Sequence, residues 1–280
     1  MENITRTVYA AYMQTCLFLN TPPAYPTNST LNEKLAINAG VIPASTDRPS
    51  LAAYVIGNKG HQGVSGTDGI FKTEPVQHRA TDASLYGQMP FVLRPINNDL
   101  SQADRAKYCF RKEVVIDGTR YAGYYGRRID KTNVVPQMLL KNVANGVETT
   151  QPFVPNSSNQ NPTPPQIAST GVNTTDGSYV QAVAALTLSI TESDAAEFLN
   201  VAKVIYGDES YGIISELALV MGVDKVVQVT STAGNFTMNE LIGAQIAAFS
   251  PAMVPVNFNP TGVDITLNVG ATEPLLNLSN

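Results

Sequence analysis

Hydrophobic positions recur with the period of a strand in some segments of the chain and with the period of a helix in others. In residues 183–190 the apolar set Ala184, Leu186, Leu188 and Ile190 alternates with a second set that includes Thr187 and Ser189, and residues 263–269 alternate cleanly, which predicts a strand in each segment. Between them, Thr191 and Asp194 form a capping box that begins an amphipathic helix, and Gly207 is a natural end for it.

Two more helices are predicted in this half of the chain. The apolar run 213–229 is interpreted as a short helix followed by a strand at 225–229. Thr237 and Glu240 form a second capping box, which predicts that another helix starts there. The C-terminal part is therefore expected to be a small α+β unit.

The N-terminal part also combines short helices with strands. Capping boxes at Thr30 and Ser101 predict helices that run to about Gly40 and through Lys107. A β-hairpin follows, with strands at 109–116 and 119–129.

The hairpin turn is predicted at Asp117-Gly118, because both of these residue types accept a positive φ in a two-residue turn. This turn places Val114 opposite Tyr121 and Phe110 opposite Tyr125.

A polar, proline-rich stretch at 145–178 separates the two parts. Its many Pro, Asn, Ser and Thr residues compete with regular backbone hydrogen bonding. It is either a flexible linker or an extended arm laid on another surface, and its apolar residues Phe153, Val154 and Ile167 favour the arm. The expected fold is α+β, with two mixed sheet-and-helix parts, 1–144 and 179–280, joined by the arm 145–178.

The composition is that of a folded protein with few charges: 43% of the residues are hydrophobic and 15% are charged. A surface of uncharged polar groups suits packing against other proteins, since such groups are less costly to bury than ions. Apolar runs are too short for a membrane helix, and the N-terminus does not have the pattern of a secretory signal. Two cysteines, Cys16 and Cys109, cannot form a disulfide framework. We expect synthesis in the cytoplasm and no membrane partner.

Residues suited to catalysis do not form a recognised motif. His61 and His78 lie in loop-like sequence without metal-ligand spacing, and the glycines of 57–69 match no phosphate-binding loop. The acidic pair at 208–209 lacks the spacing of a calcium loop. We therefore predict no catalytic, cofactor or metal site, and no enzyme.

Charge is distributed unevenly along the chain. Residues 105–131 hold eight bases and three acids, whereas residues 176–280 hold two bases and eleven acids. The basic hairpin could bind nucleic acid through phosphate contacts and aromatic stacking, although the acidic remainder argues against this. Alternatively, the basic and the acidic side chains only keep two faces of the protein hydrated and bind no partner. We favour a third interpretation, in which the hairpin of one copy meets the acidic part of the next. The candidate interface residues are Arg105, Lys107, Arg111, Lys112, Arg120, Arg127, Arg128 and Lys131.

Long strings of the sequence resemble virion structural proteins of large tailed bacteriophages. The similar strings are 74–82 and 85–95, then 197–201, 205–211, 213–216 and 222–225, and finally 264–276. This resemblance implies a non-catalytic virion component and provides no active-site residues.

Together these observations predict a structural protein of the virion, made in the bacterial host and present in multiple copies in the neck, tail or baseplate. Its expected partners are further copies of itself and other virion proteins. Two alternatives remain: a decoration protein on the capsid surface, or a glycan-binding virion module in which Tyr121, Tyr124 and Tyr125 stack on sugar rings.

Overall fold

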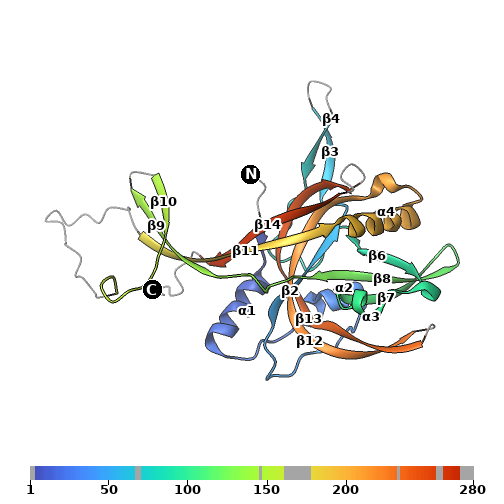
Figure 1. Ribbon diagram of the computed structural model, residues 1–280, viewed down its shortest axis with the longest axis horizontal. Helices are drawn as coiled ribbons and strands as arrows, with labels where there is room; N and C mark the ends of the chain where they lie inside the picture. Colours follow the sequence, from blue (N-terminus) through green and yellow to red (C-terminus); the bar gives the residue numbers. More distant parts are fainter. Residues whose placement is uncertain are drawn as a thin grey trace. The chain divides into compact units, whose positions relative to one another are not determined.

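The computed structural model describes residues 4–66, 71–144, 147–160, 178–231, 234–256 and 261–271. Within these ranges the chain is mostly antiparallel β-sheet (Figure 1). Four α-helices occur in the described part: α1 (Val8–Leu19), α2 (Leu31–Leu35), α3 (Gln102–Arg105) and α4 (Glu192–Tyr206). The predicted α+β class is therefore wrong, because several segments with helix-like patterns are strands.

The chain forms two compact units that interleave along the sequence. The first unit comprises residues 1–129 and 189–264, and the second comprises residues 130–188 and 265–280. The parts expected from the sequence, 1–144, 145–178 and 179–280, follow one another along the chain.

An eight-stranded sheet forms the framework of the first unit. Its strands run in the order β1-β13-β12-β2-β8-β6, and in addition β5 pairs with β2 and β7 pairs with β8. A separate hairpin joins β3 to β4. The bounds are β1 (Thr5–Arg6), β2 (Ser50–Gly57), β3 (His61–Ser65), β4 (Phe71–Pro75), β5 (Gln88–Met89), β6 (Val92–Pro95), β7 (Tyr108–Ile116), β8 (Thr119–Arg128), β12 (Ile213–Ser231) and β13 (Gly234–Pro255).

The longest strands, β12 and β13, lie where two helices were predicted. Residues 213–229 belong to β12, and Thr237 and Glu240 lie within β13, so both helix predictions are wrong. Both faces of these strands are covered near their centre, and nearly every residue there is apolar. Periodicity alone does not distinguish such a buried strand from a buried helix. Glu240 caps no helix and instead accepts a hydrogen bond from the backbone N–H of Arg111 at 3.2 Å.

The β7–β8 hairpin and the starts of the helices follow the predictions, although α2 ends at Leu35, earlier than the predicted end near Gly40, and α3 ends at Arg105. Val114 pairs with Tyr121 and Phe110 with Tyr125, as expected from the turn. The side chains of Thr30, Ser101 and Thr191 cap α2, α3 and α4, respectively. These features depend on neighbouring residues in the sequence, which explains why they are predictable.

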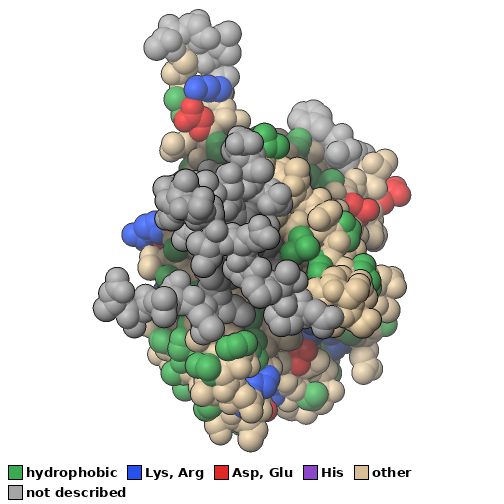
Figure 2. All heavy atoms as spheres, turned by 90° about the vertical axis from the view of Figure 1, so that its left-hand side faces the viewer, with side chains coloured by type: hydrophobic (Ala, Val, Ile, Leu, Met, Phe, Trp, Pro, Cys, Tyr) green, Lys and Arg blue, Asp and Glu red, His purple; other side chains and the backbone are tan. Residues whose placement is uncertain are grey.

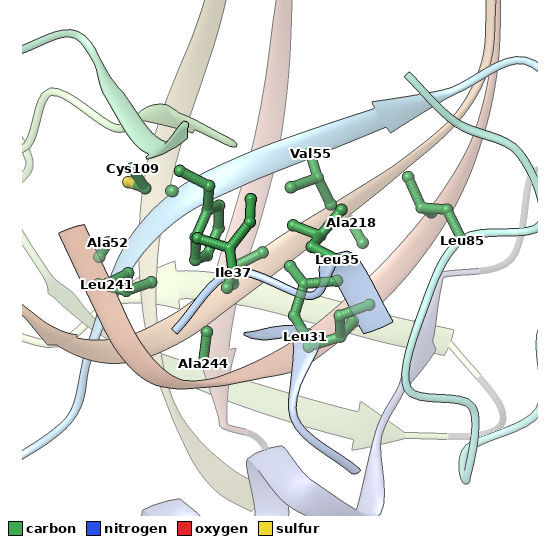
Figure 3. Packing of buried hydrophobic residues seen from close by; sticks show 14 of the residues in the cluster. Leu31, Leu35, Ile37, Ala52, Val55, Leu85, Cys109, Ala218, Leu241 and Ala244 are labelled. Atoms are coloured by element: carbon green, nitrogen blue, oxygen red, sulfur yellow. The ribbon is translucent and has the colours of Figure 1, made fainter. Parts of the chain in front are cut away.

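The main core lies between α2 and the eight-stranded sheet. Figure 3 shows Leu31 and Leu35 of α2 beside side chains from the strands, among them Val55 and Ala218. Asn32, on the same helix, is buried and bonds the backbone of β13: its amide donates to Leu241 O at 2.9 Å and accepts from Ala244 N at 2.8 Å. The helix is thus fixed to β13 by both apolar and polar contacts.

A four-stranded sheet, in the order β10-β9-β11-β14, characterises the second unit, although β11 and β14 each begin or end in the first. Its strands are β9 (Gln137–Ala144), β10 (Val147–Pro152), β11 (Ser178–Thr191) and β14 (Gly262–Ala271). The strands predicted at 183–190 and 263–269 lie within β11 and β14. The start of the predicted arm is strand β10, and residues 161–177 of the arm lie outside the described residues.

Candidate functional site

The basic hairpin meets acidic side chains of its own chain. Arg127 on β8 forms an ion pair with Asp194 at the start of α4. Arg128 pairs with Asp224 on β12 at 2.7 Å and also donates to the backbone carbonyl of Asn239. Both acids belong to the acidic C-terminal segment that was predicted to contact another copy. Arg127 and Arg128, two of the candidate interface residues, are therefore paired with acids within the first unit.

Arg111 is the most buried of the predicted interface residues, with a side chain only 2% exposed. Its guanidinium contacts Asp99 at 2.9 Å, Glu113 at 3.1 Å and the Tyr124 hydroxyl at 3.2 Å. Burial by itself lowers the pKa of Arg111, but the hydrogen bonds to Tyr124 and Asp99 outweigh burial and raise it. Arg111 therefore stabilises the hairpin through buried ionic contacts and is not part of the exposed surface.

Three further bases of the set also contact their own unit. Arg105 donates to a backbone carbonyl and lies over the Phe236 ring, 3.9 Å from its centre. Lys107 pairs with Asp104, and the ammonium of Lys112 donates to the Leu35 carbonyl at 2.8 Å.

Arg120 and Lys131 are exposed. The structure thus brings most of the eight residues together, but into intrachain contacts.

A buried histidine is a feature that sequence analysis did not find. The ring of His78 lies between those of Tyr86 and Phe249, with centroid distances of 4.1 and 3.9 Å. Its Nε2 is 2.8 Å from a carboxylate oxygen of Glu216, and its Nδ1 is 3.3 Å from Asp82. No local motif links His78 to Glu216, which lies 138 positions later in the sequence.

Glu216 is fully engaged by the segment that contains His78. Its carboxylate accepts the backbone N–H groups of Tyr86 at 3.1 Å and of Gly87 at 2.8 Å, in addition to the contact with His78. The side chain is 1% exposed. Because these donors hold the carboxylate from several sides, the arrangement fixes residues 78–87 against β12.

Asp82 continues this network to the surface. Burial by itself would raise the pKa of Asp82, but hydrogen bonds from the backbone and side chain of Arg79 and from His78 lower it below its ordinary value. Asp82 also lines an open pocket of about 350 Å³ together with Lys34, Arg79 and Ser84. The pocket is polar and contains charges of both signs.

Other reactive groups occupy structural positions. His61 contacts the backbone carbonyl of Ser215 at 3.0 Å. Cys16 and Cys109 are buried free thiols, and burial raises the pKa of Cys109 to about 12. No group of three or more His, Cys, Asp or Glu side chains suited to a metal ion occurs among the residues the structure describes.

The outer surface of α1 is unusually apolar. Val8, Tyr12, Phe18 and Leu19 are 44–68% exposed. Figure 2 shows hydrophobic side chains gathered on the lower part of its view, at the height of α1 in Figure 1. Clustered exposed apolar side chains indicate an interaction surface more strongly than scattered ones.

The second unit has few buried side chains. None of residues 130–141, 147–160 and 181–185 is buried, and the apolar side chains of Met138, Val147 and Val154 are 45%, 62% and 72% exposed. Burial begins only at Leu186 and Leu188 of β11.

The described helices include none long and apolar enough to cross a membrane. No curated protein and no solved structure matches the chain. Residues 1–280 match a family of unknown function, DUF7208. The chain therefore belongs to the DUF7208 family.

Proposed function

We propose that this protein is a non-enzymatic structural component of a tailed-bacteriophage virion, present in multiple copies in the neck, tail or baseplate. The observation that carries the proposal is the sheet of the second unit, in which none of residues 130–141, 147–160 and 181–185 is buried. Strands β9 and β10 are regularly paired, so this segment is ordered without a core of its own.

A small sheet, even one of three or more strands, is stable in water only when a hydrophobic face is packed, because its hydrogen bonds alone do not offset the loss of chain entropy. A sheet of this kind gains stability when another surface covers it. The exposed side chains of Met138, Val147 and Val154 provide apolar area for such a contact. A subunit of an assembly has that covering surface, whereas a solitary protein does not.

The proposed partners remain further copies and other virion proteins, but we now place the contacts away from the basic hairpin. Arg111, Arg127 and Arg128 already have acidic partners in the first unit. A contact through the hairpin would have to break these pairs, which favours the apolar surfaces as assembly sites. The resemblance to virion structural proteins supports the same function.

Immunogold electron microscopy of purified phage particles tests the proposal. Antibody raised against the chain is expected to label intact particles at the neck, tail or baseplate. Label over the head would support the capsid-surface alternative. Purified particles that contain none of the chain by mass spectrometry would refute a virion role of either kind.

The glycan-binding alternative receives less support from the tyrosines that suggested it. Tyr124 is 0% exposed and bonds Asp99 and Arg111, so its ring is not available for stacking on a sugar. Purified host polysaccharide is therefore expected not to bind in a co-sedimentation assay.

A further inference from the structure

Helix α1 has two apolar faces on opposite sides. Ala10, Met13 and Cys16 point inward and are buried, and the helix packs beside β13. We call the opposite side of the helix the outer face. Its residues follow the helical spacing i, i+3, i+4, i+7, i+10 and i+11, and they are Val8, Ala11, Tyr12, Thr15, Phe18 and Leu19. All six are exposed, and the twelve residues of α1 include no charge.

A helix on a protein surface normally carries charged or strongly polar side chains on the side that faces water. The outer face of α1 instead has the spacing of a helix–helix seam, in which side chains three and four positions apart form one stripe. Phe18 is the most exposed of them, at 68%. We propose that the outer face packs against the same face of a second copy of this chain, with the two helices antiparallel.

The distribution of side-chain sizes selects the antiparallel orientation. The C-terminal end of the outer face is bulky, with Phe18 and Leu19, whereas the N-terminal half contains Val8 and Ala11. In an antiparallel pair centred on the helix, Leu19 meets Val8 of the second copy and Phe18 fits between Val8 and Ala11 of the second copy. A parallel pair would instead crowd the bulky ends together and leave a gap at Ala11.

At the centre of the antiparallel pair a large side chain again meets a smaller one, since Tyr12 meets Thr15 of the second copy. The Tyr12 hydroxyl already accepts the backbone N–H of Ala24 at 2.8 Å, so the ring is held in place before association. Because the outer face is uncharged, two identical faces can meet around a two-fold axis without charge repulsion. An acidic or basic partner would find no complementary charge on α1.

The contact is small. Twelve residues make a helix about 18 Å long, so the pair buries less than the roughly 800 Å² per partner of a stable complex. The contact is therefore weak in solution and becomes effective where other contacts hold the copies close together. The inference thus rests on the proposed assembly and names one of its contacts.

Disulfide trapping tests the pairing and its orientation. The double variant Val8→Cys/Leu19→Cys is expected to form a covalent dimer under mild oxidation at high protein concentration, whereas each single variant stays monomeric. The native thiols Cys16 and Cys109 are buried. Val226→Cys, at a 69% exposed site on β12, is a matched control that is expected to form no covalent dimer. A dimer of Leu19→Cys alone would indicate parallel helices and overturn the orientation, and no dimer of any α1 variant would overturn the pairing.

Light scattering distinguishes this apolar contact from a charge-paired one. At high protein concentration, the weak association of the native chain is expected to persist when salt is raised, because screening weakens charge pairs and not apolar contacts. Phe18→Glu is expected to weaken dimerisation by at least about tenfold, and Val226→Glu to leave it unchanged. A salt-sensitive dimer that Phe18→Glu leaves unaffected would contradict the inference.

The two proposals fail in distinguishable ways. If α1 does not cross-link but the chain is found in purified particles, the virion function stands and the α1 pairing is wrong. If α1 cross-links but particles lack the chain, the pairing stands and the virion function is wrong.

Discussion

At the scale of single residues, the polar groups at the interior of the first unit connect segments far apart in the sequence. Glu216 joins β12 to His78 and to the backbone of Tyr86 and Gly87. Asn32 connects α2 to β13 in the same way. Buried polar groups of this kind stabilise a fold only while all their partners are present, because each unpaired group retains its desolvation cost.

Glu216→Ala is expected to lower the free energy of unfolding by at least about 3 kcal/mol, because it leaves several buried donors without an acceptor. Urea denaturation at neutral pH measures the change. Glu209→Ala is the matched control: Glu209 forms an exposed ion pair with Lys203, and its loss is expected to cost less than about 1 kcal/mol. Equal effects of the two substitutions would contradict the structural role of Glu216.

Glu240→Gln is expected to change how stability depends on pH. Burial raises the pKa of Glu240 above its ordinary value of 4.5, despite opposing hydrogen bonds from Asn38 and Arg111. The folded state therefore binds this proton more tightly than the unfolded state, so the group's contribution to stability is greatest at low pH. It declines as pH rises from about 4.5 through the raised pKa.

Relative to the native chain, Glu240→Gln should therefore gain stability across that pH range. Thermal unfolding at a series of pH values measures the gain. A difference between the two proteins that stays constant with pH would show that the Glu240 pKa is not raised in the fold.

At the scale of elements, local turn and cap chemistry determines the hairpin and the helix ends. Asp117 and Gly118 both have positive φ, 48° and 77°, as a two-residue turn between twisted strands requires. Gly126, within β8, also has a positive φ of 67°, and a Cβ there would lie 2.8 Å from the Phe110 ring. A substitution at Gly118 therefore tests backbone strain alone, whereas a substitution at Gly126 tests backbone strain together with steric overlap.

Gly118→Ala is expected to cost about 1 kcal/mol, since the added methyl meets no other atom and only the backbone is strained. Gly126→Ala is expected to cost about 3 kcal/mol, because the ring of Phe110 must also move. Chemical denaturation of both variants measures these costs. The strain argument would be wrong if Gly126→Ala proved no more destabilising than Gly118→Ala.

The sequence was informative about elements only where neighbouring residues determine the structure. Thr191 and Asp194 form their capping box because both groups lie in one turn. Thr237 and Glu240 have the same spacing but lie in β13, where pairing with β12 provides the backbone hydrogen bonds. The contacts between α2 and β13, and between His78 and Glu216, join distant segments, and no sequence pattern indicated them.

At the scale of the whole molecule, the uneven charge distribution is partly balanced within the chain. The acids near the C-terminus and the bases of the hairpin are far apart in the sequence but meet in the first unit, as Arg127 does with Asp194. The sequence contains complementary charges, but charge order along a chain does not determine whether they meet within one chain or between two. We therefore propose assembly through apolar surfaces, on α1 and on the second unit.

Hydrogen exchange in the second unit tests whether its sheet depends on a partner for stability. In the isolated chain, amides of β9 and β10 are expected to exchange at least about a hundredfold faster than those at the centre of β12, because none of residues 130–141 and 147–160 is buried. In purified particles the same amides should become protected as a partner covers the sheet. The centre of β12 is the internal control, since it is buried in the first unit and should not change. Strong protection of β9 and β10 in the dilute, isolated chain would mean that the sheet is stable without a partner, and the main structural support for an assembly function would be lost.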